Sequence, residues 1–279
     1  MHYPLSSSLG LMAKWMTTGL MAGALSSSAL ASSHGNSLSV GSDLSYPPYA
    51  FMEAGQPAGF DPEFMRLLAD EMGLEATFVD TRFASLITGL RAGRFDLIAS
   101  ALFMTPERAD VVDFIPYLTA GQSLVARVGD DDAPTTLDDL CGLTVGSIQG
   151  AAWIQNLESL SETCVVDQRA PIDINAYDTD PQVTQALLSR AIDVQMSDAA
   201  VAQSVVDQLG DRVSISSDHL LYPVVIGLAF RMGDDPLIDS VKTAFEALQA
   251  SGAYQQLLDK YHFQAPTDAD VSAAMSRQN

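Results

Sequence analysis

Cysteine, histidine and basic residues are scarce in this sequence of 279 residues, which holds two cysteines, four histidines and 14 basic side chains against 35 acidic ones. So few cysteines and scattered histidines exclude a cysteine-rich scaffold and leave too few ligands for a zinc site. A net charge of −21 gives no basic surface that could neutralise phosphates. We therefore expect no metal, no cofactor and no nucleic-acid partner.

Long apolar runs are also missing after the first 31 residues, because no later segment approaches the roughly 20 apolar residues that span a membrane. The first 31 residues contain no Asp, Glu or Arg, and Lys14 precedes an apolar stretch at 15–25. The small residues that end at Ala31 resemble a cleavage site. This pattern is typical of a cleavable signal peptide over residues 1–31, so we predict a periplasmic protein without membrane insertion.

What the sequence does contain is enough apolar material, 47% of its residues, for a substantial core. In an exported chain, an even pair of cysteines most often forms a disulfide. We therefore predict a bond between Cys141 and Cys164, which would close a loop of about two dozen residues and stabilise the fold by about 3 kcal/mol.

Short apolar runs alternate with amphipathic stretches along the whole chain, which predicts an α/β fold with a mostly parallel sheet. A first series ends near Gly121, and a second series follows it without a flexible linker. Asp61 is expected to cap the first helix. The predicted strands are 38–41, 77–79, 96–99, 123–127, 144–147, 172–174, 193–196 and 224–230, and the predicted helices are 61–73, 84–91, 151–160, 199–209 and those that begin at 180 and 235.

Five short motifs carry a resemblance to a known family. In chain order they are Gly41–Tyr49, Gly59–Asp61, Leu90–Asp96, Thr105–Arg108 and Val112–Phe114. With this order and spacing the sequence resembles the periplasmic solute-binding proteins of ABC importers. The resemblance extends from residue 38 to residue 263 and is to the polar-amino-acid branch, with its histidine-, lysine/arginine/ornithine- and glutamine-binding proteins.

The resemblance implies an α/β fold of the two-lobed, type II periplasmic binding protein class, with a ligand cleft between lobes joined by two crossing strands. Lobe one would comprise residues 36–122 and 218–266, lobe two residues 123–217, and a C-terminal tail residues 267–279. It further implies a monomer that captures a zwitterionic small molecule, a polar amino acid in the first instance, and delivers it to an ABC permease.

Two charged residues match the ligand clamp of the family. Arg108 offers a planar fork for a carboxylate, and Asp198 matches the acid that holds the ligand ammonium. Taken without the resemblance, Arg108 reads as a surface helix residue and Asp198 as the N-cap of a helix from Ala199. Backbone amides of a turn at Gly150 and Ala152 are expected to supplement Arg108 at a helix N-terminus.

The remaining positions of the implied ligand set are Tyr46 and Phe83, whose rings would sandwich the ligand, together with Ser100 and Ala101. Phe103 falls where many relatives have Ser or Thr, in a stretch that is also similar to ectoine-binding relatives. Aromatic faces attract organic cations, so an ectoine- or betaine-like solute is an alternative ligand, and a hydrophobic plug behind the pocket is the other interpretation of Phe103.

Asp43 matches an acid that faces the ligand side chain in relatives, and is otherwise a turn residue. A second alternative is a cyclohexadienyl or arogenate dehydratase-type enzyme on the same fold, for which Asp43 and Asp198 would be the acid candidates. No nucleophile paired with a base is evident in the sequence. We therefore expect a binding protein with no catalytic residues.

Overall fold

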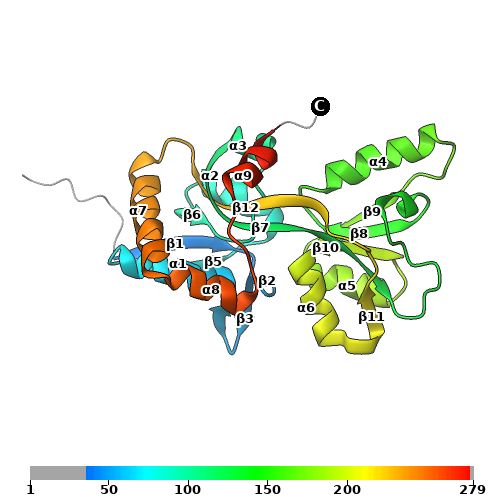
Figure 1. The fold of residues 1–279 in the computed structure, drawn as a ribbon, viewed down its shortest axis with the longest axis horizontal. Coiled ribbons are helices and arrows are strands. Elements are labelled where there is room, and N and C mark those ends of the chain that lie inside the picture. The colour runs from blue at the N-terminus through cyan, green and yellow to red at the C-terminus, as the bar shows by residue number, and fades with distance from the viewer. Residues whose placement is uncertain (1–35, 277–279) are drawn as a thin grey trace, which may run out of the picture. The chain divides into compact units, whose positions relative to one another are not determined.

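Nine strands form one mixed sheet in the computed structural model, which describes residues 36–276 (Figure 1). The predicted signal peptide, 1–31, lies outside the described residues. The strand order is β5-β1-β6-β12-β7-β10-β8-β9, and β11 pairs with β7. The strands are β1 (Ser37–Ser42), β5 (Glu75–Asp80), β6 (Leu97–Ile98), β7 (Val112–Arg127), β8 (Thr144–Ile148), β9 (Asp173–Tyr177), β10 (Val194–Asp198), β11 (Val213–Ile215) and β12 (Leu221–Arg231).

The long strands β7 and β12 join the two halves of the sheet. The first part of β7 pairs with β12, from Val112 opposite Arg231, and its last part pairs with β10 and β11. Gln122 marks the passage, because it lies opposite Leu221 of β12 and Asp198 of β10. Two crossing strands between two lobes agree with the fold that the resemblance implies, while the lobe limits given above stay a prediction.

The sheet is less parallel than predicted. The pairs β1/β5, β1/β6, β8/β10 and β8/β9 are parallel, whereas β7 and β12 pair antiparallel with each other and with all their other neighbours. The local alternation of strand and helix produces the parallel pairs. The crossing strands pair over long sequence distances, which the local pattern does not contain.

Helices cover the sheet around both halves (Figure 1). On the first helix, Phe64, Met65 and Leu68 form a buried face, and the Phe64 ring packs edge-on against Phe245 at 5.2 Å between centroids. A small separate sheet contains β2 (Ser45–Tyr46), β3 (Ala50–Glu53) and β4 (Gln56–Ala58). The helices are α1 (Phe60–Glu71), α2 (Leu86–Arg91), α3 (Pro106–Ala109), α4 (Ile154–Val166), α5 (Asp180–Leu188), α6 (Ala199–Leu209), α7 (Asp235–Ser251), α8 (Ala253–Tyr261) and α9 (Asp268–Met275).

Several helix boundaries differ from prediction, and α8 and α9 were not predicted. Gly59, not Asp61, is the N-cap of α1, and Asp61 lies inside the first turn. The helix predicted from 151 begins at Ile154. The predicted C-terminal tail contains α9, which Thr267 begins with a capping box. None of the helices in residues 36–276 is long and apolar enough to cross a membrane.

The predicted disulfide is confirmed. Cys141 and Cys164 are bonded and lie 23 residues apart in sequence. The bond ties the segment before β8 to the buried face of α4, where Cys164 is fully buried. A loop of this length corresponds to about 3 kcal/mol in the chain-entropy model.

Candidate functional site

Arg108 contacts residues of both predicted lobes. The hydroxyl of Thr105 caps α3 by accepting a hydrogen bond from the Arg108 amide, at 3.2 Å. Nη1 of Arg108 donates to the Phe103 carbonyl at 2.8 Å, and Nη2 donates to the Gly150 carbonyl at 2.9 Å. The guanidinium also lies over the Phe83 ring, 5.6 Å from its centroid. These three partners are uncharged, so the guanidinium can still pair with an anion.

Desolvation has the largest effect on the pKa of the Arg108 guanidinium. Burial lowers the pKa of Arg108 to about 10, although the nearby charge of Glu107 acts to raise it. The group therefore remains a cation at neutral pH, in a place where water screens it less than at an open surface. A carboxylate bound here would gain more than it would from an exposed arginine.

Asp43 holds Phe83 and is itself occupied by the protein. Its Oδ2 accepts from the Phe83 amide at 2.8 Å, and its Oδ1 accepts from the Ser45 hydroxyl at 2.6 Å and pairs with Arg82 at 3.1 Å. Its own amide donates to the Ser100 hydroxyl at 2.9 Å. Burial raises the pKa of Asp43, while these contacts lower it. The structure thus gives Asp43 a structural task, and direct contact with a ligand stays a prediction.

Phe103 is a buried residue at the boundary of the lobes. Its backbone forms a bridge with Ile226, and its ring lies 5.5 Å from the ring of Trp153. The Trp153 indole donates to the Ser147 hydroxyl at 2.7 Å, which orients it. Phe103 of the predicted lobe one therefore contacts a ring of the predicted lobe two, and its role as a ligand contact or a hydrophobic plug stays a prediction.

The turn before α4 contacts Arg108 through the Gly150 carbonyl, whereas the sequence predicts backbone amides beside Arg108. Gly150 has the left-handed φ of 83° and accepts from Arg108, while the Ala151 amide bonds back to the Ile148 carbonyl at 3.3 Å. Ala152 is half-buried beside it. Because α4 begins at Ile154 and not at 151, the turn lies just before the helix N-terminus, and the contribution of the Gly150 and Ala152 amides to ligand binding stays a prediction.

Asp198 ends β10 and caps α6, so the N-cap interpretation is confirmed. Its Oδ1 accepts from the Ala200 amide at 2.9 Å and the Val201 amide at 3.5 Å. Its Oδ2 is buried and makes no hydrogen bond within the described residues. Burial raises the pKa of Asp198 to about 7; the two amides and the nearby Tyr49 hydroxyl lower it, and the charge of Asp180 raises it.

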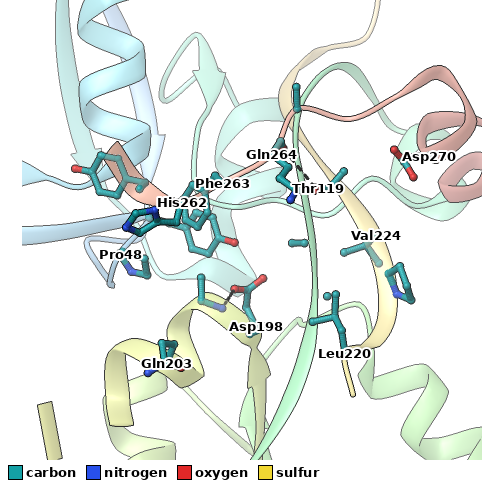
Figure 2. A pocket seen from close by; sticks show the side chains of 18 of the residues that line it. Pro48, Thr119, Asp198, Gln203, Leu220, Val224, His262, Phe263, Gln264 and Asp270 are labelled. Atoms are coloured by element: carbon teal, nitrogen blue, oxygen red, sulfur yellow. Dashed lines mark hydrogen bonds between the residues drawn. The ribbon is translucent and has the colours of Figure 1, made fainter. Parts of the chain in front are cut away.

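A cavity of about 870 Å³ extends along the crossing strands and has Asp198 in its wall. Figure 2 shows Asp198 with Pro48, His262 and Phe263 on one side and Gln203 of α6 on the other. The remaining wall comes from the crossing strands, from α6, from the end of α8 and from the segment that leads into α9. The acid is thus buried but borders open space.

Tyr46 interacts with Asp198, and Arg108 is not among the groups that act on its hydroxyl. Its ring stacks on Tyr49 at 6.1 Å between centroids, and burial together with the charges of Asp198 and Asp180 raises its pKa well above the ordinary value. A sandwich of Tyr46 and Phe83 around a ligand stays a prediction.

Sequence reasoning overlooked two residues of this region. Tyr49 ends the first motif and touches Tyr46, whereas Asp180 precedes a proline and looked like a helix start. In the structure, the Asp180 carboxylate is buried and accepts from Ser197 at 2.7 Å. Trp153, which directly precedes α4, contacts Phe103. Only Tyr49 had a usable signal, its place in the motif.

Comparison with known proteins identifies the family. Residues 38–265 match the sequence model of the bacterial extracellular solute-binding proteins, family 3. The chain belongs to this family. The L-cystine-binding protein TcyJ of Escherichia coli K12 is 28% identical over 230 residues, which cover 80% of this chain and 82% of that protein.

Solved structures of similar proteins show the same two-lobed, type II architecture. An ancestral arginine-binding protein bound to glutamine matches with a TM-score of 0.75 and 27% identity, over 82% of this chain and 98% of that one. The ancestral amino acid-binding protein AncCDT-1, a precursor of cyclohexadienyl dehydratase, matches with a TM-score of 0.71 and 28% identity, over 81% of this chain and 95% of that one. The fold of this family 3 solute-binding protein is therefore established.

Proposed function

We propose that this chain is the periplasmic, monomeric solute-binding component of an ABC importer, which captures a zwitterionic amino acid between its lobes and delivers it to a membrane permease. One observation carries the proposal: Arg108 of lobe one has only uncharged partners, and Asp198 of lobe two has a buried oxygen with no hydrogen bond in the described chain. An α-amino acid supplies the two complementary charges.

The clamp explains why a ligand would favour closure. A charge removed from water costs free energy that an opposite charge offsets, and Arg108 and Asp198 each gain that opposite charge when the ligand carboxylate and ammonium arrive. Because the two groups belong to different lobes, both are satisfied at once only when the lobes are together. The ligand then binds the closed state better than the open one, which is the condition for ligand-driven closure.

The class of ligand follows from the relatives and from the neighbouring side chains. A relative named as an L-cystine-binding protein and a neighbour bound to glutamine support a polar amino acid. Ser100, Ala101 and Ala152 would supply backbone or hydroxyl contacts beside Arg108. Asp43 would act indirectly through Phe83, since its carboxylate is already bonded to Arg82 and Ser45.

An ectoine- or betaine-like solute is the second candidate, and the aromatic rings favour it. Phe83 lies under Arg108, and Phe103 meets Trp153 across the lobes. Aromatic faces attract weakly hydrated organic cations by about 0.5 to 2 kcal/mol each. A compact zwitterion with a delocalised or methylated cation would use these rings where an amino acid side chain would not.

We propose binding without turnover. AncCDT-1 shows that binding proteins of this fold are related to a dehydratase, and Asp198, with its pKa near 7, is the acid such chemistry would use. Its Oδ1, however, is committed to the first turn of α6, and the pairing with an ammonium explains the free oxygen without a reaction.

A ligand screen tests the proposal. L-arginine, L-histidine, L-glutamine, L-cystine, ectoine and glycine betaine are added to the purified protein, and its melting temperature is measured. A true ligand at 100 times its Kd stabilises the protein by about 2.7 kcal/mol. We expect such a shift with one amino acid class. Shifts confined to ectoine or betaine would select the second candidate, and turnover of prephenate or arogenate would replace binding by catalysis.

Gly150 offers a test of closure itself. A Cβ atom at Gly150 would lie 3.1 Å from the Cα atom of Ala84 in lobe one. We expect Gly150→Ala to weaken ligand binding at least tenfold by isothermal titration, because the added methyl holds the lobes apart. Gly129→Ala is the matched control, since Gly129 has a similar φ of 87° and nothing within 4 Å of its Cβ position. Equal affinities for the two variants would contradict closure at Gly150.

A further inference from the structure

Asp61 is a fully buried acid outside the proposed clamp. Its Oδ1 accepts from the Tyr117 hydroxyl at 2.7 Å, and its Oδ2 accepts from the Ala101 amide at 2.9 Å. Burial raises the pKa of Asp61 to about 7, while these two hydrogen bonds lower it. Burying a carboxylate with only two neutral donors costs free energy compared with an apolar residue. Its two hydrogen bonds therefore indicate its role.

The Ala101 backbone is strained. Its φ of 46° lies in the left-handed region, which is unfavourable for a residue with a Cβ atom relative to the right-handed form. Such strain persists only where the surroundings hold the residue in place. The bond from the Ala101 amide to Asp61 is one such constraint, and it acts on the strained residue itself.

The segment after Ala101 leads directly to the guanidinium. The Leu102 carbonyl accepts from the Gly227 amide at 3.0 Å, and the Phe103 carbonyl accepts from Nη1 of Arg108 at 2.8 Å. A change in the Ala101 dihedral angles would turn the Phe103 carbonyl and ring away from Arg108 and Trp153. The orientation of the Arg108 side chain therefore depends on an Ala101 backbone conformation that is unfavourable in isolation.

We propose that Asp61 is a positioning residue for ligand capture: it holds Ala101 in its left-handed conformation and thereby directs the Phe103 carbonyl at Arg108. The geometric part of this inference stands on the contacts alone, and only its consequence for affinity rests on the proposed function. Tyr117, which lies on the crossing strand β7, donates to the other oxygen of Asp61, and its hydroxyl also lies near the Ala101 backbone.

Three variants of the full chain separate positioning from general stability. Asp61→Asn keeps an acceptor for Ala101 and is the conservative rescue. Asp61→Ala removes both contacts, and Asp61→Ser, whose side chain is shorter, replaces it if Asp61→Ala does not fold. Tyr117→Phe is the matched control, because it removes the Tyr117 hydroxyl, with its bond to the other oxygen, and leaves the bond between the Ala101 amide and Asp61 in place.

The first readout needs no ligand. Amide hydrogen exchange is followed by NMR at Ala101 and Phe103, with the amide of Val194 in β10 as the reference for general loosening. We expect Asp61→Ala to speed exchange at Ala101 and Phe103 at least tenfold relative to Val194, and expect Asp61→Asn and Tyr117→Phe to change that ratio less than threefold. Equal ratios in Asp61→Ala and Tyr117→Phe would overturn the proposal.

The second readout is affinity for L-arginine and L-glutamine, measured by isothermal titration. Asp61→Ala is expected to weaken binding at least tenfold, with Asp61→Asn and Tyr117→Phe within threefold of the parent protein. Full affinity in Asp61→Ala would also overturn the positioning role. If the unmodified protein binds neither amino acid, these two are excluded as its ligands and the titration is repeated with the ligand found in the screen, while the exchange ratio still decides whether Asp61 holds Ala101.

Discussion

Replacing Arg108 by Gln is expected to weaken ligand binding by about 30-fold to more than 1,000-fold, and with it to remove ligand-induced thermal stabilisation. Loss of one partner from a buried, hydrogen-bonded charge pair costs about 2 to 5 kcal/mol, and each 1.4 kcal/mol is a factor of ten in affinity. The Gln side chain also gives up the bridge to the Gly150 carbonyl that helps to hold the lobes together. Isothermal titration with the ligand found in the screen measures the loss.

Two further variants make this result specific. Arg108→Lys retains the charge but not the planar fork, so we expect it to recover only part of the affinity. Arg91→Gln removes one positive charge from an exposed position at the end of α2 and should leave binding within twofold. An Arg108→Gln protein that binds as tightly as Arg91→Gln would refute the carboxylate role.

Asp198→Asn is expected to stabilise the ligand-free protein near neutral pH and to abolish ligand capture. The pKa of Asp198 is raised from 3.8 to about 7 by burial, so the folded state binds this proton more tightly than the unfolded state does. Between about pH 4 and pH 7 the free energy of unfolding therefore falls as pH rises, by up to ~1.4 kcal/mol per pH unit for this group, and the loss is complete above pH 7.

Asn lacks this titration and still caps α6 well. The stability gain of Asp198→Asn over the parent protein should thus grow from pH 4 to pH 7 and then level off, as measured by urea unfolding at several pH values. Asp139→Asn provides a control of opposite sign, because hydrogen bonds from Thr136 and Thr135 lower the pKa of Asp139, so its removal should reduce stability above the ordinary carboxyl pKa. A pH-independent difference for Asp198→Asn would show that the carboxyl is not buried as described.

Loss of ligand capture in Asp198→Asn would follow from the carboxylate oxygen of Asp198 to which no described residue donates a hydrogen bond. Its Oδ2 is the acceptor without a hydrogen bond in the described chain, and an amide at this position offers no negative charge to a ligand ammonium. We expect at least a 30-fold loss of affinity for a zwitterion. A stabilised variant that still binds its ligand fully would place the ammonium elsewhere in the cleft.

Local features of the site were predictable because they depend on neighbours in the sequence. The cap of Thr105 on α3 and the cap of Asp198 on α6 each involve residues two or three apart. The buried face of α1 follows from the 3.6-residue spacing of its apolar positions. The motif order was enough to assign the family, and the family then supplied the expected pairing of Arg108 with Asp198.

Long-range contacts were not predictable from the same sequence. Asp61 looks like a helix cap, yet its carboxylate contacts Tyr117, 56 residues away, and Ala101, 40 residues away. Asp43 looks like a ligand acid or a turn residue, and only the fold shows it bonded to the Phe83 amide and Arg82. Nothing in the local pattern distinguishes a carboxylate that faces solvent from one that an approaching strand will cover.

By itself, the sequence determined the α/β class, the disulfide and the family, because each depends on periodicity, composition or the order of short motifs along the chain. Only the tertiary structure decided that β7 and β12 run antiparallel through the sheet, that α4 begins at Ile154, and that one oxygen of Asp198 is left without a hydrogen bond from the described residues. The physical reason is that burial and hydrogen-bond satisfaction are properties of packed neighbours, which the chain brings together only when it folds.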